Sequence, residues 1–153
     1  MQLQANEIIA GIDNENQIRV ETTIKGLYKS TTYGAIIDTG FSGSIVLPLV
    51  TAVDLGLEKI GAGNVTLADG SMKTLPMFLC KVTIAGITQD ADTLVMGNDV
   101  LIGMNIIDAF NININGPKQQ VKIEAPVTID SITIPVSQTP NILKTLKKLT
   151  GRS

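Results

Sequence analysis

The chain has 153 residues, of which 44% are hydrophobic but only 3% aromatic, with no histidine and a net charge of −2. This length is typical of one domain, and the small charge gives no long-range attraction to nucleic acid or to an anionic membrane. The absence of histidine excludes Ser-His-Asp and Cys-His catalysis and histidine-based metal sites. Acid–base chemistry would therefore depend on carboxylates, with lysine and tyrosine as weaker candidates.

The single cysteine, Cys80, excludes an internal disulfide and fits a reducing compartment. In the segment MFLCKV we expect it to be a buried thiol. No apolar run approaches the roughly 18 residues that a membrane span needs, and the N-terminal segment MQLQANEIIAG lacks the basic start of a signal peptide. We therefore expect a cytoplasmic protein that binds neither membranes nor nucleic acid.

Short runs of Ile, Val and Leu, separated by Gly, Pro, Asn and Asp, predict an all-β chain. The strands expected in the first part of the chain cover residues 17–26, 33–38 and 44–48. Residues 48–56 predict a helix, with Pro48 near its first turn and Gly56 at its end. Residues 64–86 predict a β-hairpin, because Asp69-Gly70 is a strong signal for a tight hairpin turn.

The later segments continue this pattern. Residues 87–96 are expected to extend the meander, with the acids of QDADT in a solvated turn because a calcium loop would need a glycine and a distal glutamate. Residues 99–110 predict a strand, a break at Gly103 and a short helix. Residues 110–117 alternate Asn and Ile before an Asn-Gly turn, and residues 119–125 are expected to pair with them.

Residues 125–153 differ in character from the rest. They begin with a strand-like run between prolines and end with a segment that predicts a short basic helix, with Ile142, Leu143, Leu146 and Leu149 on its apolar side. Such a helix suits a cap on its own domain better than a membrane-surface element, because short isolated helices are marginal in water. We therefore divide the chain into a domain over residues 1–124 and a C-terminal extension over residues 125–153.

Two segments of the chain are similar to each other: AIIDTG at 35–40 and DVLIGM at 99–104. Each is an apolar strand that enters a turn broken by glycine, which lets another backbone pass close by. This suggests a duplicated, roughly two-fold unit in which only the first copy carries an acid. Asp38 follows an apolar strand, where a charge costs free energy unless it is hydrogen-bonded or has a function.

The segment IIDTG, the Asp-Gly hairpin tip at 69–70 and the segment LIGMNIIDAF together resemble the retropepsin-like aspartic proteases of clan AA. The motif DTGFSG with LADG is similar to the small microbial single-domain group of that clan. The resemblance covers roughly residues 17–124. It implies an all-β fold, a closed β-barrel with one or two short helices, that acts as a homodimer on protein or peptide substrates without a metal or cofactor.

The resemblance also implies a role for individual residues. Asp38 would be the catalytic residue, paired with Asp38 of a second chain because no other aspartate has the same setting. The remaining site residues are Thr39 and Gly40 in the active turn; Leu67, Ala68, Asp69, Gly70 and Ser71 in a flap over the substrate; and Leu101, Ile102 and Gly103 in a supporting turn. The expected reaction is peptide-bond hydrolysis by a water activated between the two carboxylates.

Phe41 departs from the family pattern, in which a small residue follows Asp-Thr-Gly. Its ring would narrow the cleft near Asp38 or reshape a substrate pocket, so Phe41 and Ser42 are candidate pocket residues. Two alternatives to the protease stay open. One is a retropepsin-fold dimer with weak or no hydrolysis that serves as a binding or assembly module, and the other is an unrelated β-barrel in which Asp38 is structural.

Overall fold

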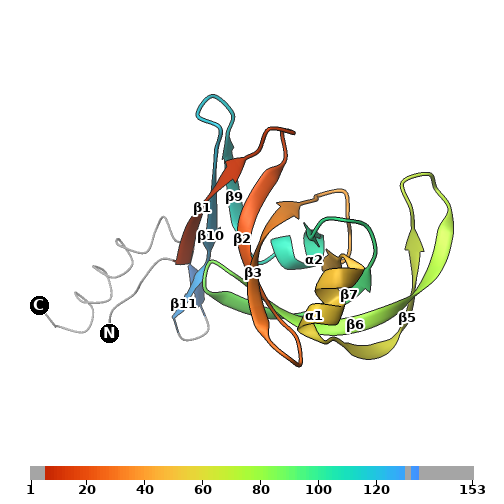
Figure 1. Cartoon of the computed structure of the whole chain (residues 1–153). Helices are drawn as coiled ribbons and strands as arrows, with labels where there is room; N and C mark the ends of the chain where they lie inside the picture. Colours follow the sequence, from red (N-terminus) through yellow and green to blue (C-terminus); the bar gives the residue numbers. More distant parts are fainter. Residues whose placement is uncertain (1–5, 130–131, 135–153) are drawn as a thin grey trace, which may run out of the picture.

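The computed structural model describes residues 6–129 and 132–134, and most of these lie in β-strands (Figure 1). The strands are β1 (Asn6–Ile12), β2 (Ile18–Lys25), β3 (Ser30–Ile37), β4 (Ile45–Leu47), β5 (Glu58–Thr66), β6 (Met72–Ile84), β7 (Ile87–Val95), β8 (Leu101–Ile102), β9 (Asn111–Asn115), β10 (Gln120–Ala125), β11 (Val127–Ile129) and β12 (Ile132–Ile134). The helices are α1 (Leu49–Leu55) and α2 (Met104–Ile107). The prediction of a mostly β chain with one or two short helices is confirmed.

One large sheet joins β1 to β10 in the order β5-β6-β7-β4-β8-β3-β2-β1-β10-β9. Strand β2 pairs with β3 and also with β6, so the sheet curls back on itself around one core. Two pairings are parallel, β3 with β8 and β4 with β7. Among the strands that the structure describes, β11 and β12 pair only with each other, in a separate two-stranded sheet.

The core is built from aliphatic side chains, as the low aromatic content requires. Its largest fully buried members are Ile24, Ile45, Leu47, Leu55, Ile102, Ile106 and Ile123. Burying one such side chain contributes about 1.5–3 kcal/mol. Cys80 is 3% exposed within this core, which confirms the buried thiol.

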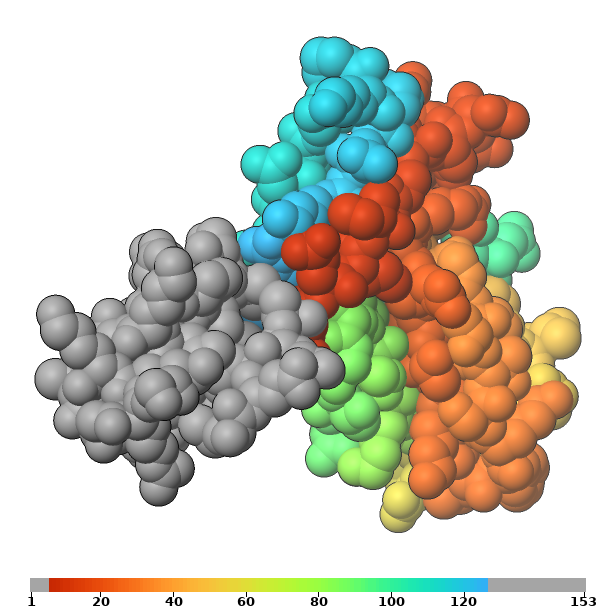
Figure 2. Space-filling model, turned by 90° about the vertical axis from the view of Figure 1, so that its left-hand side faces the viewer, coloured from red at the N-terminus to blue at the C-terminus, as the bar shows by residue number. Residues whose placement is uncertain are grey.

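Strand β1 was not predicted from the sequence. It runs antiparallel to β10, with Asn6 opposite Ala125 and Gly11 opposite Gln120, and its end pairs with β2. Figure 2 shows residues 6–12 (red) against the blue strand of residues 120–125. The strand is therefore fixed by residues more than a hundred positions later in the chain, which its own sequence pattern does not reveal.

Strand β5 begins earlier than predicted. The hairpin was expected from residue 64, but β5 starts at Glu58 and pairs with β6 through Gly61 and Gly63. A register shift between Lys59 and Gly61 accommodates the glycine-rich stretch, as a bulge does. Pairing with the long strand β6 outweighs the weak strand preference of glycine.

The solvated turn expected at QDADT is wrong, because Asp90 and Asp92 lie inside strand β7. Their side chains point away from the core while Ala91 and Thr93 between them are fully buried. Alternation of buried and exposed positions is what a strand with one wet face produces. The basic helix expected at the C-terminal end lies outside the described residues.

Candidate active site

Asp38 directly follows strand β3 and is held by backbone groups. Its N–H donates to the carbonyl of Ile102 at 2.9 Å, which extends the parallel pairing of β3 with β8. The N–H of Gly40 donates to Asp38 Oδ1 at 3.0 Å. Burial of Ala35 and Ile36 fixes the position of strand β3 in the core. Asp38, which is half-buried, therefore has a defined position at the end of this strand.

The two glycine-broken turns pack directly on each other. The N–H groups of Gly103, Met104 and Asn105 donate to the carbonyls of Ser44, Phe41 and Gly43, at 2.8, 2.8 and 3.1 Å respectively. A Cβ atom on Gly103 would lie 2.9 Å from the carbonyl carbon of Gly43, so a side chain has no room there. The predicted close approach of a second backbone at Gly103 is confirmed. Gly103 is also the N-cap residue of helix α2.

The ring of Phe41 lies in the space that two glycines leave open. A Cβ atom on Gly43 would be 2.7 Å from Phe41 Cε1, and one on Gly103 would be 2.5 Å from Phe41 Cδ2. The ring is half-buried and lines two hollows of the surface. It therefore shapes the surface beside Asp38.

The first of these hollows, which we call the Asp38 hollow, has a volume of about 480 Å³. It brings the predicted catalytic residue Asp38 together with Leu67 and Ala68 of the β5–β6 turn and with Leu101 of the second turn. Its other lining residues are Gly40, Phe41, Val46, Val65, Thr66, Leu94 and Met96. On its other side, Asp38 borders a further hollow with Gln17 and Ile18, so the carboxylate stands at an open position.

The β5–β6 turn has a defined structure. Leu67 and Ser71 are joined by a backbone hydrogen bond of 2.8 Å, and Gly70 has φ +82°, a left-handed value that glycine adopts readily. Hydrogen bonds from the hydroxyl and the N–H of Ser71 hold the pKa of Asp69 below its usual value. The hairpin reaches out beyond the rest of the sheet at the right of Figure 1.

The other hollow beside Phe41, which we call the second hollow, has a volume of about 500 Å³ and does not include Asp38. Ser42, a predicted pocket residue, lines it. Gly40, predicted in the active turn, lines it too. The sequence analysis missed its other lining residues, which are Gly43, Ser44, Gly63, Asn64, Val65, Thr66, Met77, Asp92, Leu94 and Asn105. They come from separate strands, and no sequence signal links them, because the register of those strands was unknown.

Other aspartates of the described chain are engaged elsewhere. Asp54 pairs with Lys29 at 2.7 Å, and Arg19 pairs with Asp13 at 2.7 Å and with Asp99 at 3.7 Å. None of them lines the Asp38 hollow, and neither does Asp69 or Asp108.

Several predicted site residues lie near that hollow without lining it. Thr39 is exposed next to Asp38, the carbonyl of Ile102 accepts a hydrogen bond from the Asp38 N–H, and Gly103 packs under the first turn.

In the part of the chain that the structure describes, no three Asp, Glu, Cys or His side chains form a group able to hold a metal. No helix among the described residues is long and apolar enough to cross a membrane.

Comparison with known proteins gives matches in structure alone. No family model matches the chain, and no curated protein sequence matches it. A retropepsin-like aspartic protease from Rickettsia conorii superposes with a TM-score of 0.56 and 18% sequence identity, over 84% of this chain and 97% of that one. The protease of Simian Foamy Virus (mac) superposes with a TM-score of 0.43 and 18% identity, over 59% of this chain and 91% of that one. The similarity to the Rickettsia structure, over nearly its whole length, shows that the chain has a retropepsin-like fold.

Proposed function

We propose that the protein is an aspartic endopeptidase that works as a dimer, with one Asp38 from each chain in a single catalytic centre. One observation carries this proposal. Asp38 is half-buried at the end of a core strand and borders a hollow that it shares with the β5–β6 turn, and among the described residues no second carboxylate lines that hollow. A site of this kind is incomplete until a second copy supplies its own Asp38.

The chemistry follows from the closeness of the two carboxylates. Like charges about 3 Å apart cannot both ionise, so the pair shares one proton. The ionised carboxylate takes a proton from a bound water, and the neutral one polarises the carbonyl of the peptide bond. The Gly40 N–H on Oδ1 fixes the orientation of the carboxylate.

The surrounding residues would complete the site in the dimer. A two-fold axis brings the same surface of each chain together, so the exposed Thr39 would meet Thr39 of the second copy and hold the two turns by their hydroxyls. The β5–β6 hairpin, with Leu67 and Ala68 toward the Asp38 hollow, would close over the substrate and exclude water. We also propose that the catalytic domain ends near residue 124, because within the described part of the chain β11 and β12 pair with each other and not with the large sheet.

The test is a mixing experiment with Asp38→Asn, whose neutral amide fits the same space. The variant alone should not cleave a denatured protein substrate, while its dimer should form as in the wild type. After full exchange of equal amounts, about a quarter of the dimers contain two wild-type chains if pairing shows no preference. Activity should then be about a quarter of that of the same total concentration of wild type. Activity of one half would mean that each chain works alone, and the shared centre would be wrong.

The binding or assembly module stays the second candidate because of Phe41. This ring borders the Asp38 hollow, where the family pattern has a small residue. If it blocks the approach of a peptide bond to the carboxylates, the wild type should bind peptides without cleaving them, and Phe41→Ser should gain hydrolysis. Cleavage by the wild type at the same rate as by Phe41→Ser would remove this candidate.

A further inference from the structure

The second hollow combines an apolar wall with one charged side chain. Its apolar wall consists of Phe41, Val65, Met77 and Leu94, which come from the active turn, β5, β6 and β7. Among the described residues that line it, Asp92 is the single ionisable one, and no lysine or arginine is present. A hollow of about 500 Å³ with this lining has room for a long side chain and carries a negative charge.

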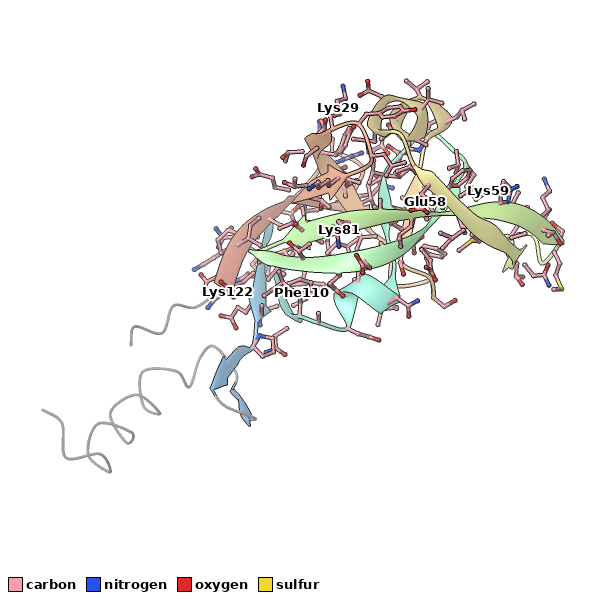
Figure 3. The ribbon with its side chains drawn as sticks, turned by 90° about the horizontal axis from the view of Figure 1, so that it is seen from below. Lys29, Glu58, Lys59, Lys81, Phe110 and Lys122 are labelled. Atoms are coloured by element: carbon pink, nitrogen blue, oxygen red, sulfur yellow. The ribbon has the colours of Figure 1, made fainter. Side chains whose placement is uncertain are left out.

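Asp92 has no cationic partner among the described residues, in contrast to the acid two positions before it. Asp90 lies opposite Lys81 on β6 and forms an ion pair with it, with a hydrogen bond of 2.7 Å from Nζ to Oδ1. Asp92 lies opposite Leu79, which carries no charge. Figure 3 shows Lys81 on the β6–β7 ribbon, set back from the free end of the β5–β6 hairpin. The charge of Asp90 is thus compensated within the chain, and that of Asp92 is available to a ligand.

Further hydrogen-bond acceptors line the same hollow. Asn105 and Ser44 contribute polar side chains to the lining, as does Asn64, whose amide oxygen already accepts a hydrogen bond from the Thr74 hydroxyl at 2.8 Å. Ser44 is only 7% exposed and lines the hollow. A hydroxyl in this position can accept a hydrogen bond from a ligand N–H group in place of water.

We propose that the second hollow binds an arginine or lysine side chain of the substrate, with Asp92 as the residue that selects it. The aliphatic stem would lie along Met77 and Leu94, and the cationic head would reach Asp92, since long basic side chains bury their stems and keep their charge near a polar group. Phe41 lines both hollows, but Asp38 lines only the Asp38 hollow. The selected residue is therefore not the one whose side chain occupies the Asp38 hollow. This inference rests on the proposed function in taking the ligand to be a peptide.

The experiment uses capped peptides of neutral residues in which a single arginine is moved through successive positions. Matched sets carry norleucine or glutamate in place of the arginine. At one position arginine should raise kcat/KM about fivefold over norleucine, as expected for a solvent-accessible ion pair. Asp92→Asn should lose this preference, and Asp92→Lys should favour the glutamate peptide. Asp90→Asn, the matched control, should keep the arginine preference, and 1 M NaCl should weaken it.

A second readout separates this inference from the proposed protease activity. Binding of the arginine and norleucine peptides to Asp38→Asn is measured by calorimetry, with and without Asp92→Asn. Cleavage without an Asp92-dependent preference for arginine would overturn the inference and leave the protease standing. If Asp38→Asn binds the arginine peptides more tightly than the norleucine peptides but the wild type cleaves none of them, the protease proposal would be overturned and the inference supported. Neither cleavage nor binding by any member of the sets would overturn both.

Discussion

The position of the Phe41 ring can be tested by adding one methyl group beneath it. In Gly43→Ala the three atoms nearest to the new Cβ would all belong to the ring of Phe41, with Cε1 at 2.7 Å. The φ angle of Gly43 is outside the left-handed range, so the cost of the change is steric and not conformational. Overpacking of this kind costs about 1–3 kcal/mol of unfolding free energy. In a Phe41→Ala background the same substitution should cost less than about 0.5 kcal/mol, because the clashing ring is gone.

Gly103→Ala provides the matched control. Its Cβ would meet the backbone carbonyl of Gly43 as well as the ring, and the carbonyl cannot move without breaking the hydrogen bond from Asn105. This substitution should therefore cost about 2 kcal/mol or more in both backgrounds, at the upper part of the overpacking range.

The measurement is urea unfolding followed by circular dichroism, at one fixed protein concentration because the proposed dimerisation would shift the apparent stability. The coupling energy between positions 41 and 43 should be at least about 1 kcal/mol. Equal costs of Gly43→Ala with and without the ring would show that Phe41 does not lie over this turn. The account of the ring as part of the lining of both hollows would then be refuted.

Three further predictions follow from the hairpin and the core. Gly70→Val should lower kcat/KM by distorting the β5–β6 turn, because valine is strained at φ +82°, while Gly86→Val, at φ +78° in another turn, should leave peptide cleavage unchanged. Hydrogen bonds from Ser71 lower the pKa of Asp69, so the stability that Asp69 gives to the turn is present above the unfolded pKa of 3.8 and is lost as pH falls through the folded pKa. In Ser71→Ala an NMR titration should show the pKa of Asp69 rising toward 3.8. An unchanged pKa would contradict this account of the turn. Burial raises the pKa of the Cys80 thiol, so iodoacetamide should label it slowly at pH 8 until urea unfolds the chain, and fast labelling of the folded protein would contradict its burial.

The fold and the position of Asp38 could be predicted because both depend on local signals. Apolar runs cut by glycine predicted β3, β4 and helix α2, and the Asp69-Gly70 turn predicted the hairpin whose Gly70 has a positive φ. The similarity of AIIDTG to DVLIGM predicted a close approach at Gly103, which the Gly43 carbonyl makes. In each case a few neighbouring residues determine the backbone conformation.

The second hollow could not be predicted, since its walls depend on strand register. Asp92 lies opposite Leu79 and Met77 lies opposite Leu94, and a shift of one position on β7 would turn Asp92 into the core. The sequence offered Asp90 and Asp92 as equivalent acids, but Lys81 opposite Asp90 makes them different. The residues that we propose as catalytic lie in turns and are therefore accessible to sequence reasoning in this chain. The residues that we propose for substrate selection become visible only when the pairing of β6 with β7 is known.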